Sequence, residues 1–82
     1  MDLSFDYINM TEDTFKVSTA PKKIWINFWG KGNFLKEDYG KIIKLFGDFP
    51  HTEIIMMNLN KKTREVLSNL FQDYSRIKVL AK

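Results

Sequence analysis

The clearest strand in the chain is Ile24-Trp25-Ile26-Asn27-Phe28-Trp29, six residues dense in β-branched and aromatic side chains. Alternation along a strand places the two isoleucines and the phenylalanine on one face, and the two tryptophans and the asparagine on the other. Both faces lean apolar. This is typical of a central strand that is covered on both sides, or of a strand whose second face meets a partner.

The residues after this strand alternate between helix and strand patterns. A glycine turn at 30–33 leads into a helix with an apolar stripe over 35–46, and a continuous apolar run at 54–57 is typical of a buried parallel strand. A second helix follows its cap Asn60, and residues 76–80 form a last strand. Strands that alternate with helices predict right-handed crossovers and a parallel core.

The N-terminal segment predicts a hairpin. Residues 3–7 alternate apolar and polar side chains, Phe15 and Val17 alternate again, and turn-forming residues lie between them at 9–13. The predicted fold is therefore a small single α/β domain spanning 1–82. It consists of an N-terminal β-hairpin followed by β-α-β-α-β, with a mixed, mainly parallel sheet and helices packed on it.

Composition excludes several classes of protein. The 82 residues contain no cysteine, which rules out disulfides, thiol nucleophiles and cysteine-based zinc sites. No apolar run approaches the roughly 18 residues that span a bilayer, and the N-terminus lacks the basic start and apolar core of a signal peptide, so we expect a cytoplasmic protein without a membrane partner. A net charge of +3 permits a polyanionic partner without requiring one.

The loops at the carboxyl ends of the predicted parallel strands form the best candidate site, because ligands of open α/β sheets bind at this edge. Both loops open helices, where Asn33 and Asn60 are placed as caps, and lysines accompany the exposed backbone donors, which suits a phosphate or an acidic protein surface. The alternative is two ordinary capped helix starts with solubilising lysines. The predicted partner-binding residues are Trp29, Lys31, Gly32, Asn33, Phe34, Asn60, Lys61 and Lys62.

Nucleic-acid binding is the competing interpretation. Trp25, Trp29 and Phe34 would offer rings on which bases stack, although aromatic residues at strand spacing are more often part of a core. Phosphate contacts would then make the affinity fall steeply with salt. The basic residues of this predicted surface are Lys22, Lys23, Lys31, Lys61 and Lys62.

Candidate catalytic groups are isolated in the sequence. The single His51 has no second histidine or cysteine with which to bind a metal. Glu12-Asp13 lies in a predicted turn, and Glu37-Asp38 lies in the first turn of a helix, where negative charge is favourable through the helix dipole. We therefore expect no enzyme, no cofactor and no metal site.

Residues 24–80 resemble the STAS domains and their bacterial STAS-like relatives. The shared pattern is an apolar strand, a glycine turn, a helix around 34–39, and the run 54–60 leading into a helix with Val66. Where family members carry a phosphorylated Ser or Thr at the start of the first of these helices, this chain has Asn33 and Phe34. The resemblance implies a non-enzymatic, protein-binding regulatory module that uses the edge at 30–33.

The expected function is accordingly that of a small adaptor or inhibitor that binds a protein partner through the carboxyl edge of its sheet. The alternative is a nucleic-acid-binding protein with a lysine and aromatic surface. The sequence gives neither the identity of the partner nor the oligomeric state.

Overall fold

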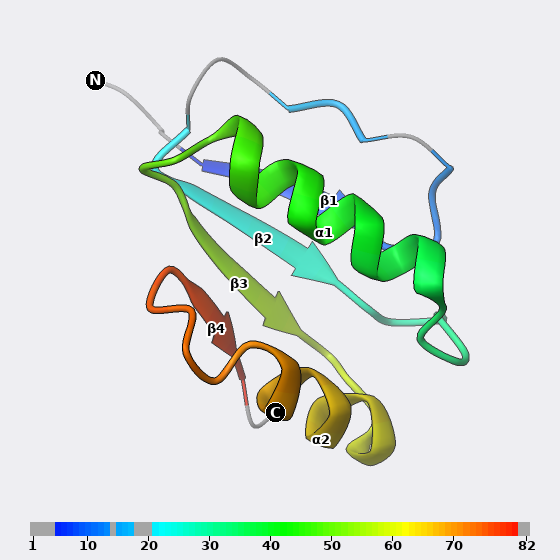
Figure 1. Ribbon diagram of the computed structural model, residues 1–82. Coiled ribbons are helices and arrows are strands. Elements are labelled where there is room, and N and C mark those ends of the chain that lie inside the picture. Colours follow the sequence, from blue (N-terminus) through cyan, green and yellow to red (C-terminus); the bar gives the residue numbers. More distant parts are fainter. Residues whose placement is uncertain (1–4, 14, 18–20, 81–82) are drawn as a thin grey trace.

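The computed structural model describes residues 5–13, 15–17 and 21–80 and shows one α/β domain (Figure 1). All four strands in these ranges are parallel, and their order in the sheet, β1-β2-β3-β4, follows their order in the chain. The elements in chain order are β1 (Phe5–Asn9), β2 (Lys23–Asn27), α1 (Lys36–Asp48), β3 (Glu53–Met57), α2 (Lys61–Leu70) and β4 (Ile77–Val79).

The predicted N-terminal hairpin is wrong, and the sheet is parallel rather than mixed. The chain does turn after β1, where the Glu12 N–H donates to the carbonyl of Asn9 at 3.1 Å. However, β1 then pairs in parallel with β2, and residues 15–17 belong to no strand. Phe15 and Val17 instead pack against the core as part of the connection that returns to the start of β2. Burial of these two side chains beside α1 is the reason that their strand-like alternation misleads.

Both helices cover the same face of the sheet (Figure 1). When consecutive parallel strands are neighbours and each crossover is right-handed, every connection lies on one side of the sheet. The strand side chains that face the helices are buried and form one apolar core with the helices and the loops. Its buried members are Ile8, Met10, Ile24, Ile26, Phe28, Ile42, Leu45, Ile54, Met56, Leu59, Leu67, Phe71 and Ile77.

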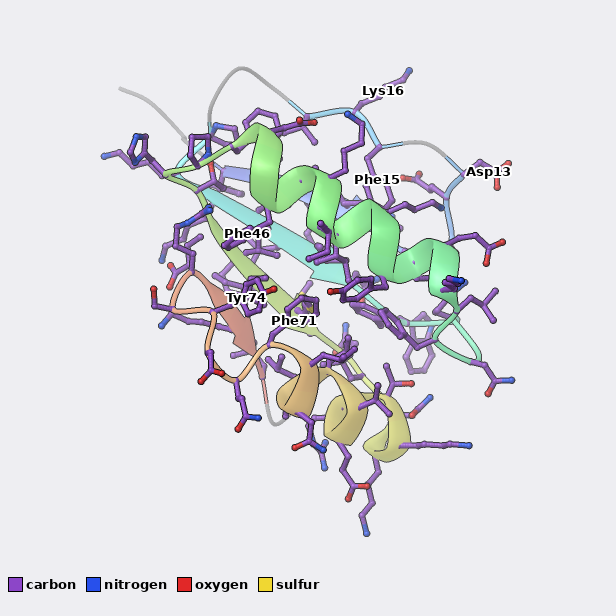
Figure 2. The ribbon with its side chains drawn as sticks, viewed as in Figure 1. Asp13, Phe15, Lys16, Phe46, Phe71 and Tyr74 are labelled. Carbon is purple, nitrogen blue, oxygen red and sulfur yellow. The ribbon has the colours of Figure 1, made fainter. Side chains whose placement is uncertain are left out.

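Aromatic rings close the core on the side of α2. Tyr74 meets both Phe46 and Phe71 edge to face, with ring centroids 5.1 and 5.2 Å apart, and Phe71 also stacks on Tyr39 at 5.8 Å. Figure 2 shows Phe46, Tyr74 and Phe71 grouped between α1 and the end of α2. Such pairs stabilise by about 0.5–1.5 kcal/mol each beyond the area that they bury.

One of the two predicted helix caps is confirmed. The Asn60 side chain accepts a hydrogen bond from the Thr63 N–H at 2.8 Å, and α2 begins directly after it. Asn33 does not cap α1, because the loop continues for two more residues and Leu35 occupies the cap position. Phe34 lies in this extra length and packs against Phe28 with ring centroids 6.3 Å apart.

Arg76 ties the end of α1 to the start of β4. Its guanidinium donates to the carbonyl groups of Phe49 and Thr52 at 2.8 Å and of Phe46 at 3.1 Å, and it lies 3.9 Å from the centre of the Phe46 ring. A cation at this place satisfies carbonyl groups at the negative end of the helix dipole. One side chain thereby joins three segments of the chain.

Replacing Arg76 with Met should lower the free energy of unfolding by about 3 kcal/mol, because hydrogen bonds to a charged donor contribute about 1.5–3 kcal/mol each and the carbonyl groups lose their partner. Urea denaturation measures the change. The exposed Lys36 is a matched control, and Lys36→Met should change stability by less than about 0.5 kcal/mol. Equal stability of the two variants would contradict the role assigned to Arg76.

Candidate functional site

The structure brings most of the predicted site residues together at the carboxyl edge of the sheet. Two shallow hollows lie there, one beside the start of α2 and one beside the end of β2, and Asn60 lines both. Gly32 is exposed in the loop between β2 and α1. The predicted residues that line the first hollow are Asn33, Phe34, Asn60, Lys61 and Lys62, and those that line the second are Trp29, Lys31 and Asn60.

This edge lacks the crevice that holds ligands in many α/β proteins. Such a crevice opens where the strand order reverses, because two adjacent loops then leave toward opposite faces of the sheet. Here the strand order never reverses among the described strands, and both βα loops lead to helices on the same face. The carboxyl edge therefore carries two shallow hollows in place of such a crevice.

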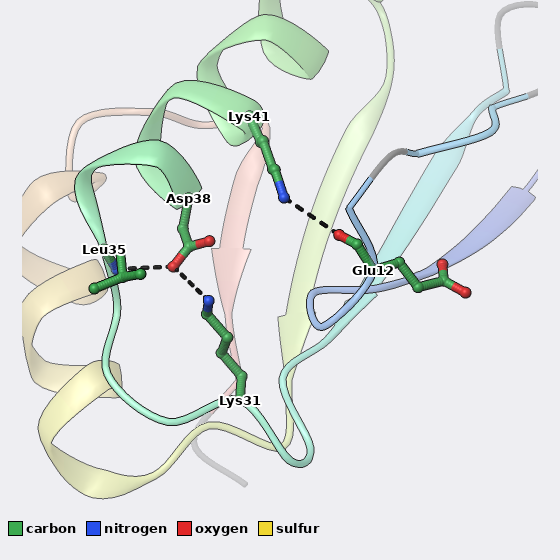
Figure 3. A network of polar contacts seen from close by, with 5 residues as sticks. All are labelled: Glu12, Lys31, Leu35, Asp38 and Lys41. Carbon is green, nitrogen blue, oxygen red and sulfur yellow. Dashed lines mark hydrogen bonds and ion pairs between the residues drawn. The ribbon is translucent and has the colours of Figure 1, made fainter.

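Lys31 serves the start of α1. Its ammonium lies 3.0 Å from Oδ2 of Asp38, and the same oxygen accepts the Leu35 N–H at 2.8 Å (Figure 3). The Asp38 side chain is 3% exposed and that of Lys31 is 19% exposed, so this pair is largely withdrawn from water. The cation predicted to meet a partner is thus engaged in fixing the helix start.

A second polar contact holds the first turn of the connection after β1 against α1. The Lys41 ammonium donates to the backbone carbonyl of Glu12 at 3.2 Å (Figure 3), and it also lies 5.3 Å from the centre of the Phe15 ring. These contacts fasten the connection where it passes the helix. They are structural, and the exposed large side chains of the carboxyl edge include Trp29, Leu35, Lys61 and Lys62.

Lys31→Glu should destabilise the fold by about 3 kcal/mol, because removing one partner of a buried ion pair costs about 3–5 kcal/mol and a second carboxylate would face Asp38. Lys31→Met should fall between this variant and the wild type. Chemical denaturation measures all three proteins. Lys62→Glu is the control at the same edge, and its acid in the first turn of α2 should be neutral or slightly stabilising. If Lys31→Glu is as stable as this control, the ion pair has no structural role.

The face of the sheet that points away from the helices carries a row of large side chains. Tyr7, Trp25, Ile55 and Lys78 are register partners across β1, β2, β3 and β4. Alternation sends these side chains away from the core, and Ile55 is outside the core cluster although it is only 4% exposed. Its neighbours in the row therefore bury it.

Charged and amide side chains border this row. On one side lie Phe5, Lys23 and Glu53, which are register partners, and the Glu53 carboxylate lies 3.9 Å from the Lys23 ammonium and 3.3 Å from that of Lys78. On the other side, the Asn27 amide donates to Asn9 at 2.9 Å and accepts from Asn58 at 2.7 Å. The polar residues thus pair with one another around an apolar centre.

This surface, the open face, is made of Phe5, Tyr7, Lys23, Trp25, Asn27, Glu53, Ile55 and Lys78. Its rings are available to a partner, since Phe5 is 49% exposed and Tyr7 54% exposed, while Trp25 is half-buried between its neighbours. Parallel sheets are almost always covered on both faces. In the part of the chain that the structure describes, no element covers this one.

The sequence signals this surface only in part. Trp25 is where alternation predicts it, on a second face that is apolar enough to meet a partner. Phe5 and Tyr7 also alternate, but the predicted antiparallel hairpin does not place their strand beside the strand of Trp25. The parallel pairing of β1 with β2 sets Tyr7 directly beside Trp25. Trp29, 77% exposed, lies two residues past the carboxyl end of β2, where it lines one of the hollows of the carboxyl edge.

Two further features are absent from the described residues. Within 5–13, 15–17 and 21–80, no three His, Asp or Glu side chains are grouped so that they could hold a metal ion. Over the same residues, no helix has the length and apolarity needed to cross a membrane.

Comparisons with protein-family models, with curated proteins and with solved structures gave no match. The resemblance to STAS domains therefore stays a prediction.

Proposed function

We propose that this protein is a small non-enzymatic protein-binding module, an adaptor or inhibitor, that acts through the open face of its sheet. The observation that carries the proposal is the row of Tyr7, Trp25 and Ile55 on a parallel sheet whose second face no described element covers. The centres of protein interfaces are enriched in aromatic residues and depleted of charge, and their rims are polar. The ion pairs and the amide ladder around this row match such a rim.

The open face offers a partner more exposed aromatic surface than the carboxyl edge does. At the edge, Lys31 is paired with Asp38, Asn60 caps α2 and Phe34 packs on Phe28. On the open face, Phe5 and Tyr7 are exposed over about half of their area, and tyrosine and tryptophan are the residue types that most often dominate binding energy. The exposed Trp29 would extend a contact on the open face toward the edge.

Tyr7→Asp should abolish binding of a protein partner and leave the fold intact, because the side chain is half exposed on an outer strand. The test is quantitative capture from a lysate of the source organism on immobilised wild type, Tyr7→Asp and Lys62→Glu. We expect proteins, among them any endogenous copy of this chain, that the wild type and Lys62→Glu retain and that Tyr7→Asp loses by at least about tenfold.

Thermal melting provides the control for this experiment, and the three proteins should unfold within a few degrees of one another. The opposite pattern, in which Lys62→Glu loses the retained proteins and Tyr7→Asp keeps them, would move the binding surface to the carboxyl edge. Loss in neither variant would remove both surfaces.

Single-stranded nucleic acid is the second candidate partner, and the same surface favours it. Exposed rings on a sheet stack with bases, and Lys23 and Lys78 stand beside the rings as contacts for phosphates. Glu53 lies between these two lysines and offsets part of their charge. Because this carboxylate repels phosphate groups, we expect a protein rather than a nucleic acid as the partner.

Fluorescence anisotropy with labelled 20-nucleotide DNA and RNA tests this candidate. If Lys23 and Lys78 neutralise two phosphates, raising the salt from about 20 to about 200 mM should weaken binding by about 25-fold. Tyr7→Asp should abolish binding at both salt concentrations. Absence of binding at about 20 mM salt with about 100 μM protein would reject the nucleic-acid function.

A further inference from the structure

We propose that the occupant of the open face is a second copy of this chain, packed face to face about a twofold axis that runs parallel to the strands between β2 and β3. The inference rests on the proposed function, since it names the protein that the open face binds. It follows from the register of the four strands and from the charges that this register places on the surface.

A twofold rotation about such an axis keeps the direction of the strands and reverses their order. The β2 strand of one copy then lies over β3 of the other, and β1 lies over β4. Lys23 and Glu53 are register partners on β2 and β3, so each Lys23 faces Glu53 of the second copy. The interface therefore forms two symmetric ion pairs from charges that already lie on the surface.

The central row of register partners is complementary to its copy as well. Trp25 lies over the position of Ile55 of the second copy at the centre of the contact, where the neighbours of Ile55 already cover most of its side chain. Tyr7 faces Lys78 of the second copy, and an ammonium over an aromatic ring is attractive. Because two packed sheets cross at about 30°, these residues are neighbours across the interface rather than strictly opposed pairs.

The other in-plane twofold, perpendicular to the strands, fits the surface poorly. It lays each strand over its own copy in the reverse direction, with the central row over itself. Lys78 would then face Lys78, and Glu53 would face Met57. A like-charge contact and a carboxylate buried against a thioether are both unfavourable. Charge complementarity thus selects the axis parallel to the strands.

The size of the surface sets the strength of the dimer. Four strands spaced about 4.8 Å apart, with up to five residues at about 3.3 Å each, cover a flat area of roughly 300 Å² per copy, to which the projecting side chains add. A stable interface buries about 800 Å² per partner. We therefore expect reversible self-association with a dissociation constant on the order of 10–100 μM.

Sedimentation equilibrium of the purified chain from about 5 μM to about 1 mM tests the proposal. The wild type should change from the 9.7 kDa monomer toward the dimer over this range. Tyr7→Asp should stay monomeric. Leu70→Asp is the matched control, since Leu70 is 46% exposed on the helical layer rather than on the open face, and it should dimerise like the wild type.

Two charge variants test the axis itself. Lys23→Glu and Glu53→Lys should each weaken self-association by at least tenfold, because like charges then face one another across the interface. An equimolar mixture of the two variants restores opposite charges at both contacts and should form a heterodimer. Thermal melting of each variant identifies any loss of folding. Failure of the folded mixture to associate would overturn the proposed arrangement.

A wild type that remains monomeric at about 1 mM would overturn the second copy as occupant. The proposed function is tested separately by capture from lysate. If Tyr7-dependent capture persists while the purified chain is monomeric, the open face binds a different protein. If both are absent, the proposed function fails together with the dimer.

Discussion

The described connections between the four strands all cross the same face of the sheet, and the other properties of the molecule depend on this constraint. Four parallel strands follow one another in chain order, so right-handed crossovers leave them no second face to cover. The two helices and the extended connection after β1 therefore share a single core. The same constraint removes the crevice at the carboxyl edge and leaves an aromatic surface opposite the helices.

The polar residues divide between the two surfaces according to their surroundings. At the carboxyl edge, Asp38 and Asn60 accept backbone N–H groups at helix starts, where an unpaired buried donor costs about 1–3 kcal/mol, and Lys31 pairs with Asp38. On the open face, Lys23, Glu53 and Lys78 pair in a position that water still reaches, and such pairs contribute little to stability. Charges that stabilise little where they lie are the ones that can change partners when another surface arrives.

The sequence predicts the helices and the central strands well, because their periodicity is strong. The strands at 24–29, 54–57 and 76–80 and both helices occur within a few residues of their predicted positions, and Asn60 caps the second helix. Phe15 and Val17 mislead, since alternate burial in an extended connection has the same pattern as alternate burial in a strand. Alternation also shows that Trp25 and Ile26 face opposite ways, but not which face the helices cover. That depends on which strands become neighbours, a property of the whole chain.

The guanidinium of Arg76 makes the end of the first helix depend on a residue much later in the chain. Its three acceptors lie at 46–52, some 24 to 30 residues earlier in the chain, and β4 begins at the next residue. A nascent chain that has not reached residue 76 lacks both this clamp and the fourth strand, so α1 ends in carbonyl groups that only water can satisfy. The fourth strand is thus joined directly to the side chain that satisfies the end of the first helix.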